Sequence, residues 1–178
     1  MDPVPQENDY AISKWVNELQ CKNFQKRYGN EIMVLRFFNA YGPGEHYNNY
    51  RSVVCLFCYR ALFNIPYDVY KNYHRVFMYI DDFVPTLVNA CENFISGEIV
   101  NIGGQEYRSV EELSNIILKQ LGKNDDFVTY LSEDTHNIVN KRPNIEKAKK
   151  LFNHNPTISL EEGVEKTLGW MKKTYFKN

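Results

Sequence analysis

The sequence predicts an α/β fold, and three observations support this prediction. Segments in which apolar residues recur at helical spacing alternate along the chain with short apolar runs typical of strands. One of these runs, residues 32–35, is apolar on both faces, as in a parallel strand buried inside a sheet. The 178 residues, of which 43% are hydrophobic and 24% charged, have the composition of a globular chain that can bury a core.

The first half of the chain contains the expected first strand and a helix on each side of it. In chain order, the expected elements are a helix, a strand, a loop and a helix: residues 9–28, 31–38, 39–50 and 52–63. Asn8 and Asp9 are N-cap candidates for the first helix, and Gly29 ends it because glycine readily adopts the left-handed C′ conformation. Since the first strand follows a helix and is apolar on both faces, we expect sheet neighbours on both of its sides.

The second half alternates short strands with helices. In chain order, the expected elements are two strands, a helix, a strand and three helices: residues 67–70, 76–80, 83–94, 99–102, 109–121, 144–152 and 159–175. Asp81 or Asp82 is expected to cap the helix at residues 83–94. Ser109 and Ser159 each precede a glutamate by three residues, and this capping-box pattern predicts the start of two helices.

The charge balance and the cysteines restrict the class of protein. The chain has 21 basic and 22 acidic residues, so no basic excess is available to bind a nucleic acid. The apolar stretch at residues 52–63 is too short to span a bilayer, and the first residues lack the segments of a secretory signal. The four cysteines lie in apolar helical patterns that indicate reduced thiols: Cys21, Cys55, Cys58 and Cys91. We therefore expect a cytoplasmic protein that binds neither nucleic acid nor membrane.

Tyr10 and Lys14 form the first candidate for chemistry. Residues four apart on a helix share a face, so Lys14 places an ammonium beside the Tyr10 phenol. A nearby cation favours the phenolate form, and such a tyrosine can exchange a proton with a hydroxyl on carbon. By itself, the spacing also fits an ordinary pair on a helix surface. A second match, Tyr67 and Lys71, lies in an expected strand, where residues four apart are about 13 Å from each other and do not couple in this way.

Further segments follow this pair in order along the chain. They are Leu35-Arg36-Phe37-Phe38-Asn39-Ala40-Tyr41-Gly42-Pro43-Gly44, Arg75-Val76-Phe77-Met78-Tyr79-Ile80-Asp81-Asp82, Val100-Asn101-Ile102-Gly103-Gly104, Lys147-Ala148-Lys149-Lys150-Leu151 and Ser159-Leu160-Glu161-Glu162-Gly163. Together with Tyr10 and Lys14, this set resembles the extended short-chain dehydrogenase/reductase family, the NAD-dependent nucleotide-sugar epimerases and dehydratases. The resemblance covers nearly the whole chain.

The resemblance implies a fold and a place within it. Residues 1–178 would be the C-terminal portion of such an enzyme: part of a Rossmann-type parallel sheet plus a small mixed α/β substrate-binding subdomain. The N-terminal part would be absent, because the nine glycines form no Gly-x-x-Gly-x-x-Gly turn for the dinucleotide. The implied partners are a nucleotide-diphosphate sugar, and either a second copy in a homodimer or the missing N-terminal half.

The same resemblance implies an activity and two catalytic residues. The activity would be that of a nucleotide-sugar epimerase or dehydratase, like UDP-glucose 4-epimerases or dTDP-glucose 4,6-dehydratases, with transient NAD-dependent oxidation of a hexose. Tyr10 would be the acid/base at the sugar hydroxyl, and Lys14 would assist it and hold the nicotinamide ribose of NAD. The alternative is a non-catalytic fragment that binds a nucleotide sugar, or takes part in assembly, and lacks the NAD site.

Four residues would bind the substrate according to the resemblance. Asn39 would contact the sugar nucleotide, and Arg75 would bind the diphosphate, to which a guanidinium offers a bidentate fork. Asn101 is a further candidate, as is Arg51 at the start of the helix that contacts the base. Asn39 also fits a simple turn residue, and Arg75 fits a surface ion pair with the two aspartates that follow it.

Some segments depart from the family pattern. Arg142 is a loose match to a late-loop arginine that often contacts a phosphate, and Leu151-Phe152-Asn153 replaces the usual Leu-Gly-aromatic helix end.

No metal site is expected, because Cys55 and Cys58 lie in an apolar helix and no second pair completes a zinc site. The histidines have no metal-ligand spacing and are expected in loops or at the surface: His46, His74, His136 and His154.

Overall fold

The structure, a computed structural model that describes residues 8–132 and 139–176, confirms the predicted α/β fold. Its helices are α1 (Asp9–Tyr28), α2 (Val53–Leu62), α3 (Ile80–Glu92), α4 (Val110–Leu121), α5 (Glu146–Phe152) and α6 (Leu160–Tyr175). Its strands are β1 (Val34–Phe38), β2 (Ala40–Tyr41), β3 (Tyr67–Tyr70), β4 (His74–Val76), β5 (Met78–Tyr79), β6 (Ile99–Gly103), β7 (Tyr107–Ser109), β8 (Val128–Leu131) and β9 (Asn140–Lys141). Among the described residues, no helix has the length and hydropathy needed to cross a bilayer.

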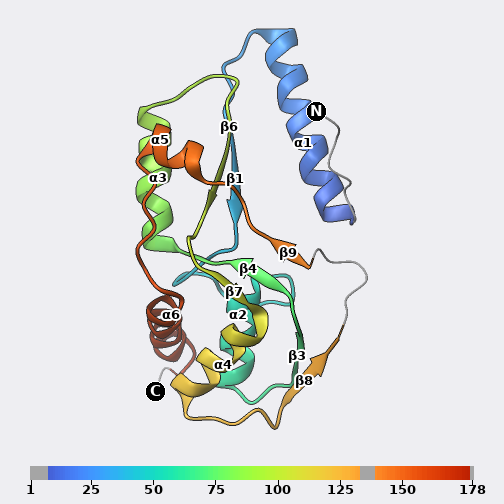
Figure 1. The fold of residues 1–178 in the computed structure, drawn as a ribbon, viewed down its shortest axis with the longest axis vertical. Coiled ribbons are helices and arrows are strands. Elements are labelled where there is room, and N and C mark those ends of the chain that lie inside the picture. The colour runs from blue at the N-terminus through green and yellow to red at the C-terminus, as the bar shows by residue number, and fades with distance from the viewer. Residues whose placement is uncertain (1–7, 133–138, 177–178) are drawn as a thin grey trace.

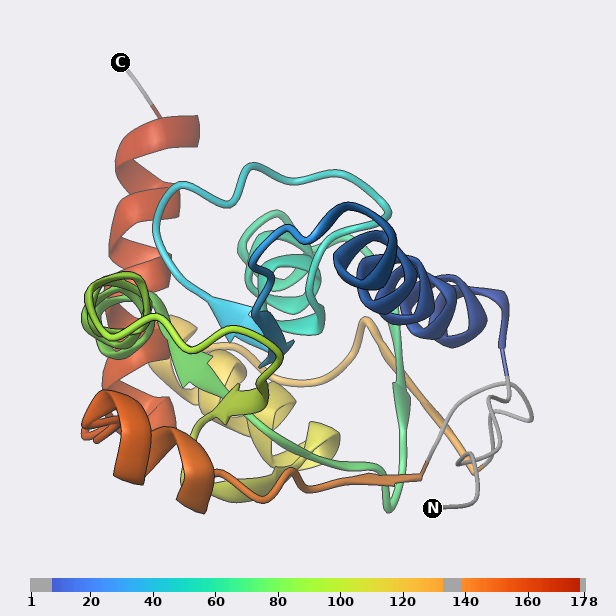
Figure 2. The same cartoon turned by 90° about the horizontal axis from the view of Figure 1, so that it is seen from above.

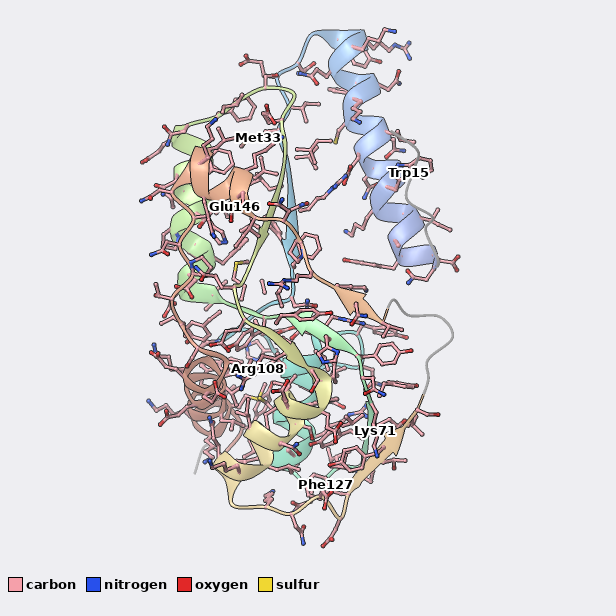
Figure 3. All side chains as sticks on the ribbon, in the orientation of Figure 1. Trp15, Met33, Lys71, Arg108, Phe127 and Glu146 are labelled. Atoms are coloured by element: carbon pink, nitrogen blue, oxygen red, sulfur yellow. The ribbon has the colours of Figure 1, made fainter. Side chains whose placement is uncertain are left out.

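The upper layer of the fold is built on a pair of parallel strands, β1 and β6. They run in register from Val34 opposite Ile99 to Phe38 opposite Gly103. Helices α3 and α5 lie on one side of this pair and α1 lies on the other, as Figures 1 and 2 show. Met33 lies between α3 and the strands (Figure 3). The core of this layer consists of Met78, Phe83, Ala90, Val100, Ile102, Ala148 and Phe152.

The lower layer has a larger core between α2, α4 and α6 (Figure 1). The parallel pair β3–β8 packs beside α4, and the three-stranded sheet β7–β4–β9 lies between the two layers. Both predicted capping serines are confirmed: Ser109 accepts a hydrogen bond from the Glu112 amide and Ser159 accepts one from the Glu162 amide. The two helices therefore begin where the sequence predicts.

Helix α1 stands apart from both cores. None of its residues is buried, and five large apolar side chains are between 38% and 49% exposed: Ile12, Trp15, Val16, Leu19 and Phe24. The side that approaches the rest of the chain is largely polar: Glu18 pairs with Arg36, and the Gln25 amide donates to the Ser96 hydroxyl. Helix α1 thus presents an apolar surface that the described part of the chain leaves exposed.

Strand β1 has one strand partner within the described residues, although the sequence predicts neighbours on both sides. Its second edge pairs with no described strand. Phe37 is 50% exposed, even though its ring packs edge-on against Phe83 at a centroid distance of 4.6 Å. The described residues therefore leave one edge of β1 and part of its apolar surface uncovered.

Two local predictions are wrong. Residues 76–80 do not form one strand: β4 and β5 are separated at Phe77, because β4 pairs with β7 and β9 whereas β5 pairs with β2. Neither Asp81 nor Asp82 caps a helix, because both lie inside the first turn of α3, whose N-cap is Tyr79. The Asp82 carboxylate instead accepts hydrogen bonds from the backbone amides at residues 157 and 158, in the connection between α5 and α6.

Candidate functional site

Asn39 joins the end of β1 to the segment that follows Arg75. Its backbone is left-handed, with φ of 46°, a conformation that asparagine adopts more readily than most residues. Its side-chain amide donates to the Val76 carbonyl at 2.8 Å, and its own carbonyl accepts from the Met78 amide at 3.2 Å. Asn39 is therefore a turn residue, as one reading of the sequence held, and it also lies beside the segment that carries Arg75.

Arg75 is a buried cation in β4, 6% exposed. Its Nη1 atom donates to the carbonyls of His74 and Val139, each at 2.8 Å, and its guanidinium lies 5.7 Å from the ring centre of Tyr73. Asp82, one of the two aspartates expected to pair with Arg75, is engaged by the amides of the α5–α6 connection. Burying a guanidinium costs free energy unless it is hydrogen-bonded, so these carbonyls hold Arg75 in place.

Arg75 is the central member of a row of three basic residues. In the sheet register, it lies opposite Lys141 of β9 on one side and Arg108 of β7 on the other. Paired residues on neighbouring strands project from the same face of a sheet. Arg108, labelled in Figure 3, is paired with Glu112 and Glu161. Arg75 and Lys141 are neighbours in this row.

Lys141 is the residue that sequence reasoning missed. The expected late-loop cation was Arg142, but its guanidinium lies 5.4 Å from the ring centre of Tyr107 in β7, on the far side of β4 from β9. Only the pairing of β9 with β4 identifies Lys141 as the neighbour of Arg75. Lys141 and Arg142 are adjacent in the sequence, so the sequence alone does not show which of them lies opposite Arg75.

The other two substrate candidates lie away from Asn39. Asn101 is opposite Arg36 in the β1–β6 pair, and its side-chain amide makes a long hydrogen bond of 3.3 Å to the Asn144 carbonyl. Arg51 is exposed and directly precedes Ser52, the N-cap of α2. Within the described part of the chain, Arg51 takes part in no ion pair.

Tyr10 and Lys14 lie one turn apart on α1, as predicted. The Lys14 ammonium is 5.4 Å from the centre of the Tyr10 ring, and Tyr10 is 72% exposed. In Figure 1 the N-terminal end of α1 lies at the level where β1 and β6 end. Tyr28, at the other end of α1, is also exposed beside a cation, with the Arg27 guanidinium 5.3 Å from its ring centre, so exposure next to a cation does not by itself distinguish Tyr10.

His154 lies in the connection between α5 and α6, which agrees with the expected loop position, but it is buried. It is 2% exposed, and its two ring nitrogens contact the Thr86 hydroxyl at 2.7 Å and the Gly103 carbonyl at 2.8 Å. Asn153, with φ of 51°, ends α5 in the left-handed conformation that glycine often adopts at this position of a helix. His136 lies outside the described residues.

Two observations concern metal and dinucleotide binding by the described residues. Among the described residues, no three His, Cys, Asp or Glu side chains gather as a metal site would require. The adjacent pair Gly103-Gly104 is no dinucleotide cradle, because a Cβ on Gly104 would overlap the carbonyl of Phe77. Tyr10 and Lys14 are therefore the residues of the described chain that the resemblance assigns to NAD.

Comparison with known proteins identifies relatives over nearly the whole chain. The model of the NAD dependent epimerase/dehydratase family matches residues 1–103. UDP-glucuronic acid decarboxylase 1 of Xenopus tropicalis is 32% identical over 97% of this chain and 41% of its own length. A protein of Methanocaldococcus jannaschii described as a putative UDP-glucose 4-epimerase is 30% identical over 96% of this chain and 55% of its own length.

Solved structures show the same relationship. The UDP-glucuronic acid 4-epimerase of Bacillus cereus, crystallised with UDP-glucuronic acid and NAD, has a TM-score of 0.87 and 28% identity over 97% of this chain and 55% of its own. The epimerase Mth375 of Methanothermobacter thermautotrophicus has a TM-score of 0.88 and 26% identity over 98% of this chain and 53% of its own. The chain thus spans about half the length of the proteins that it matches.

Proposed function

The chain belongs to the NAD-dependent epimerase/dehydratase family, and from this we propose that it is the substrate-side portion of a nucleotide-sugar epimerase or dehydratase. The observation that carries the proposal is the exposed Tyr10–Lys14 pair on one face of α1, at the end of the layer where β1 and β6 finish. Ligands of parallel α/β sheets bind at the carboxyl ends of the strands. The position of the pair on α1 supports a role in acid/base chemistry on such a ligand.

In the proposed reaction Tyr10 is the acid/base that removes and returns the proton of a sugar hydroxyl. Lys14 stabilises the phenolate and contacts the nicotinamide ribose. NAD, when bound, accepts and returns the hydride of the transient oxidation. In this proposal Tyr10 and Lys14 hold and move the proton, whereas burial raises the pKa of the Tyr41 hydroxyl and so disfavours its phenolate form.

Substrate binding is assigned to the residues around the end of β1. Arg75 and Lys141 would bind the diphosphate, since adjacent cations on paired strands suit two phosphates. Asn39 would contact the sugar nucleotide from the turn after β1, Arg51 would approach its nucleotide part from the start of α2, and Asn101 would be a further contact. UDP-glucuronic acid is the ligand named for the 4-epimerase of Bacillus cereus, and we take it as the first ligand to test.

The binding part of the proposal can be tested by calorimetric titration of the purified chain with UDP-glucuronic acid. Arg75→Lys keeps the charge but loses the fork, and we expect it to weaken binding about tenfold. Lys141→Ala should weaken binding several-fold, whereas Lys150→Ala, which removes an exposed lysine of α5, should leave binding unchanged. If Lys141→Ala binds UDP-glucuronic acid as tightly as Lys150→Ala, the proposed diphosphate site is wrong. It is also wrong if glucuronic acid binds as tightly as UDP-glucuronic acid.

The dinucleotide-binding portion is proposed to come from an N-terminal part, either of the same polypeptide or of another chain. The open edge of β1 supports this, because a further parallel strand would pair there. The isolated chain should then bind NAD weakly or not at all. NAD binding that is lost in a Tyr10→Phe, Lys14→Ala variant would instead reveal a cofactor site in this chain.

A non-catalytic role in binding or assembly is the alternative, and the apolar surface of α1 is compatible with either role. We propose that a second copy covers this surface in a homodimer, because Ile12, Trp15, Val16 and Leu19 are exposed together. Light scattering should show a dimer that Leu19→Glu dissociates and Lys22→Glu does not. A wild-type monomer would contradict the dimer. The four free thiols also agree with the cytoplasmic location that we propose.

A further inference from the structure

The loop between β2 and α2, residues 42–52, lies against the last turns of α6. Figure 2 shows this loop running from β2 to α2, with α6 nearby. The Tyr47 backbone amide donates a hydrogen bond of 3.0 Å to the Tyr175 hydroxyl, although the two residues are 128 positions apart in sequence. The His46 ring packs edge-on against Trp170 at a centroid distance of 5.2 Å. The loop is thus held by the end of the chain rather than by its sequence neighbours alone.

Aromatic packing makes this attachment specific. The Tyr47 ring stacks on Tyr59 of α2, with centroids 3.8 Å apart and an interplanar angle of 10°. Tyr175 then packs edge-on against the same Tyr59 ring at 5.0 Å. Offset-stacked and edge-on aromatic pairs each add stabilisation beyond the area that they bury. The Tyr175 hydroxyl therefore reaches the Tyr47 amide from a ring whose position is already fixed by packing.

The far end of the same loop is fixed independently. The Glu45 carboxylate accepts hydrogen bonds from the amide and the hydroxyl of Ser52, at 2.8 and 2.7 Å. Between these two attachments, the amide of Arg51 donates to the Asn48 carbonyl at 3.3 Å. Arg51 thus lies on a short segment that is held at Tyr47 on one side and at Ser52 on the other.

We propose that Tyr175 is a positioning residue for Arg51. By accepting the Tyr47 amide hydrogen bond, it keeps the segment from Tyr47 to Ser52 in the one conformation that presents Arg51 to the nucleotide part of the substrate. A cation that is already placed loses less entropy when it binds an anion. This inference rests on the proposed function, because it takes Arg51 to contact the nucleotide.

The test compares four variants of the purified chain, with UDP as the probe. Tyr175→Phe keeps the ring and removes the hydroxyl, and Tyr130→Phe is the matched control, because the Tyr130 hydroxyl bonds Asp125 in another part of the fold. Arg51→Ala and the double variant Arg51→Ala, Tyr175→Phe complete the set. We expect Tyr175→Phe to weaken UDP binding about fivefold, the usual range for one lost hydrogen bond. We expect no further loss when it is added to Arg51→Ala, because a residue that acts through Arg51 has no effect without it.

Amide hydrogen exchange gives a second readout that does not depend on nucleotide binding. Tyr175→Phe should accelerate exchange at residues 47–51 at least tenfold, whereas Tyr130→Phe should leave those amides unchanged. Unchanged exchange in Tyr175→Phe would overturn the inference, as would an equal loss of UDP affinity with and without Arg51. If the wild-type chain fails to bind UDP, the proposed nucleotide site fails, and the inference fails with it even where exchange shows that Tyr175 holds the loop.

Discussion

Glu18 and Arg36 form a two-point ion pair between α1 and β1. The Nε and Nη2 atoms of Arg36 donate to the two carboxylate oxygens of Glu18, both at 2.6 Å. The hydrogen bonds to Glu18 raise the pKa of the Arg36 guanidinium. Because none of the residues of α1 is buried, the position of the helix depends strongly on this pair.

We expect Glu18→Gln to loosen α1 from β1. Bidentate pairs are stronger than single-contact pairs, and a coupling free energy of about 1 kcal/mol between positions 18 and 36 is expected in a double-mutant cycle. The measurement is amide exchange in α1. The control cycle uses the exposed Lys149–Glu146 pair, for which amide exchange in α5 is measured. Equal coupling in the two cycles would show that the bidentate geometry adds nothing.

Gly163→Ala should destabilise the chain by about 1–3 kcal/mol, because overpacking a tight contact has this cost. A Cβ at position 163 would overlap the Tyr41 hydroxyl and lie 2.8 Å from the Tyr41 Cζ atom, and Tyr41 is buried. Gly169 lies in the same helix with open space around it, so Gly169→Ala should stabilise by about 0.5–1 kcal/mol. Urea unfolding of the two variants measures both effects, and a loss of the same size at both sites would refute the packing argument.

The capping box of α4 should make part of the stability depend on pH. The Glu112 carboxylate accepts the Ser109 amide hydrogen bond, and this lowers the pKa of Glu112. A lowered folded-state pKa gives stability that is complete above the unfolded-state value, about 4.3, and is lost as pH falls through the folded-state value. Since Glu112 is half exposed, solvent screens the charge, and we expect only about 0.5 kcal/mol.

Unfolding midpoints at pH 7 and pH 3 would check this expectation. The difference in stability between wild type and Glu112→Gln should be present at pH 7 and absent at pH 3. Glu165→Gln, on the exposed part of α6, is the control and should show no such dependence. A Glu112→Gln effect that is equally large at pH 3 would show that the charge is irrelevant.

The cysteines should differ sharply in their reaction with iodoacetamide. The thiolate is the reactive form, and burial raises the pKa of Cys55 to about 12 and that of Cys58 as well. Cys91 is exposed. At pH 8 we expect Cys91 to be modified at least ten times faster than Cys55 or Cys58, as peptide mass spectrometry can follow. Rapid labelling of Cys58 in the folded chain would contradict its burial.

The sequence was sufficient for the elements whose signals are local. Capping serines, Gly29 and helical spacing predicted the starts and ends of most helices, and β3 and β6 were found from their apolar runs. Helical spacing placed Tyr10 and Lys14 on one helix face, the strand pattern placed Asn39 directly after β1, and the structure agrees with these positions.

What failed depends on contacts between distant parts of the chain. Strand β9 has two residues and is defined by its pairing with β4, so no local pattern could identify Lys141 as the neighbour of Arg75. Asp82 looked like a helix cap because its partners, the amides of the α5–α6 connection, lie about 75 residues later. The burial of His154 in its loop could not be predicted, because Thr86 and Gly103, which contact its ring, are brought to it only by the packing of α3 and β6.

The two contacts that hold α1 in place affect the rate at which a partner can associate with it. The Glu18–Arg36 pair, together with the Gln25–Ser96 hydrogen bond, places the helix before anything covers its apolar side. A partner therefore meets a surface that is already formed, and the encounter involves no coupled folding step. Association should then approach the rate of rigid protein pairs, about 10⁵–10⁷ M⁻¹s⁻¹, rather than the slower rate of partners that must first change conformation.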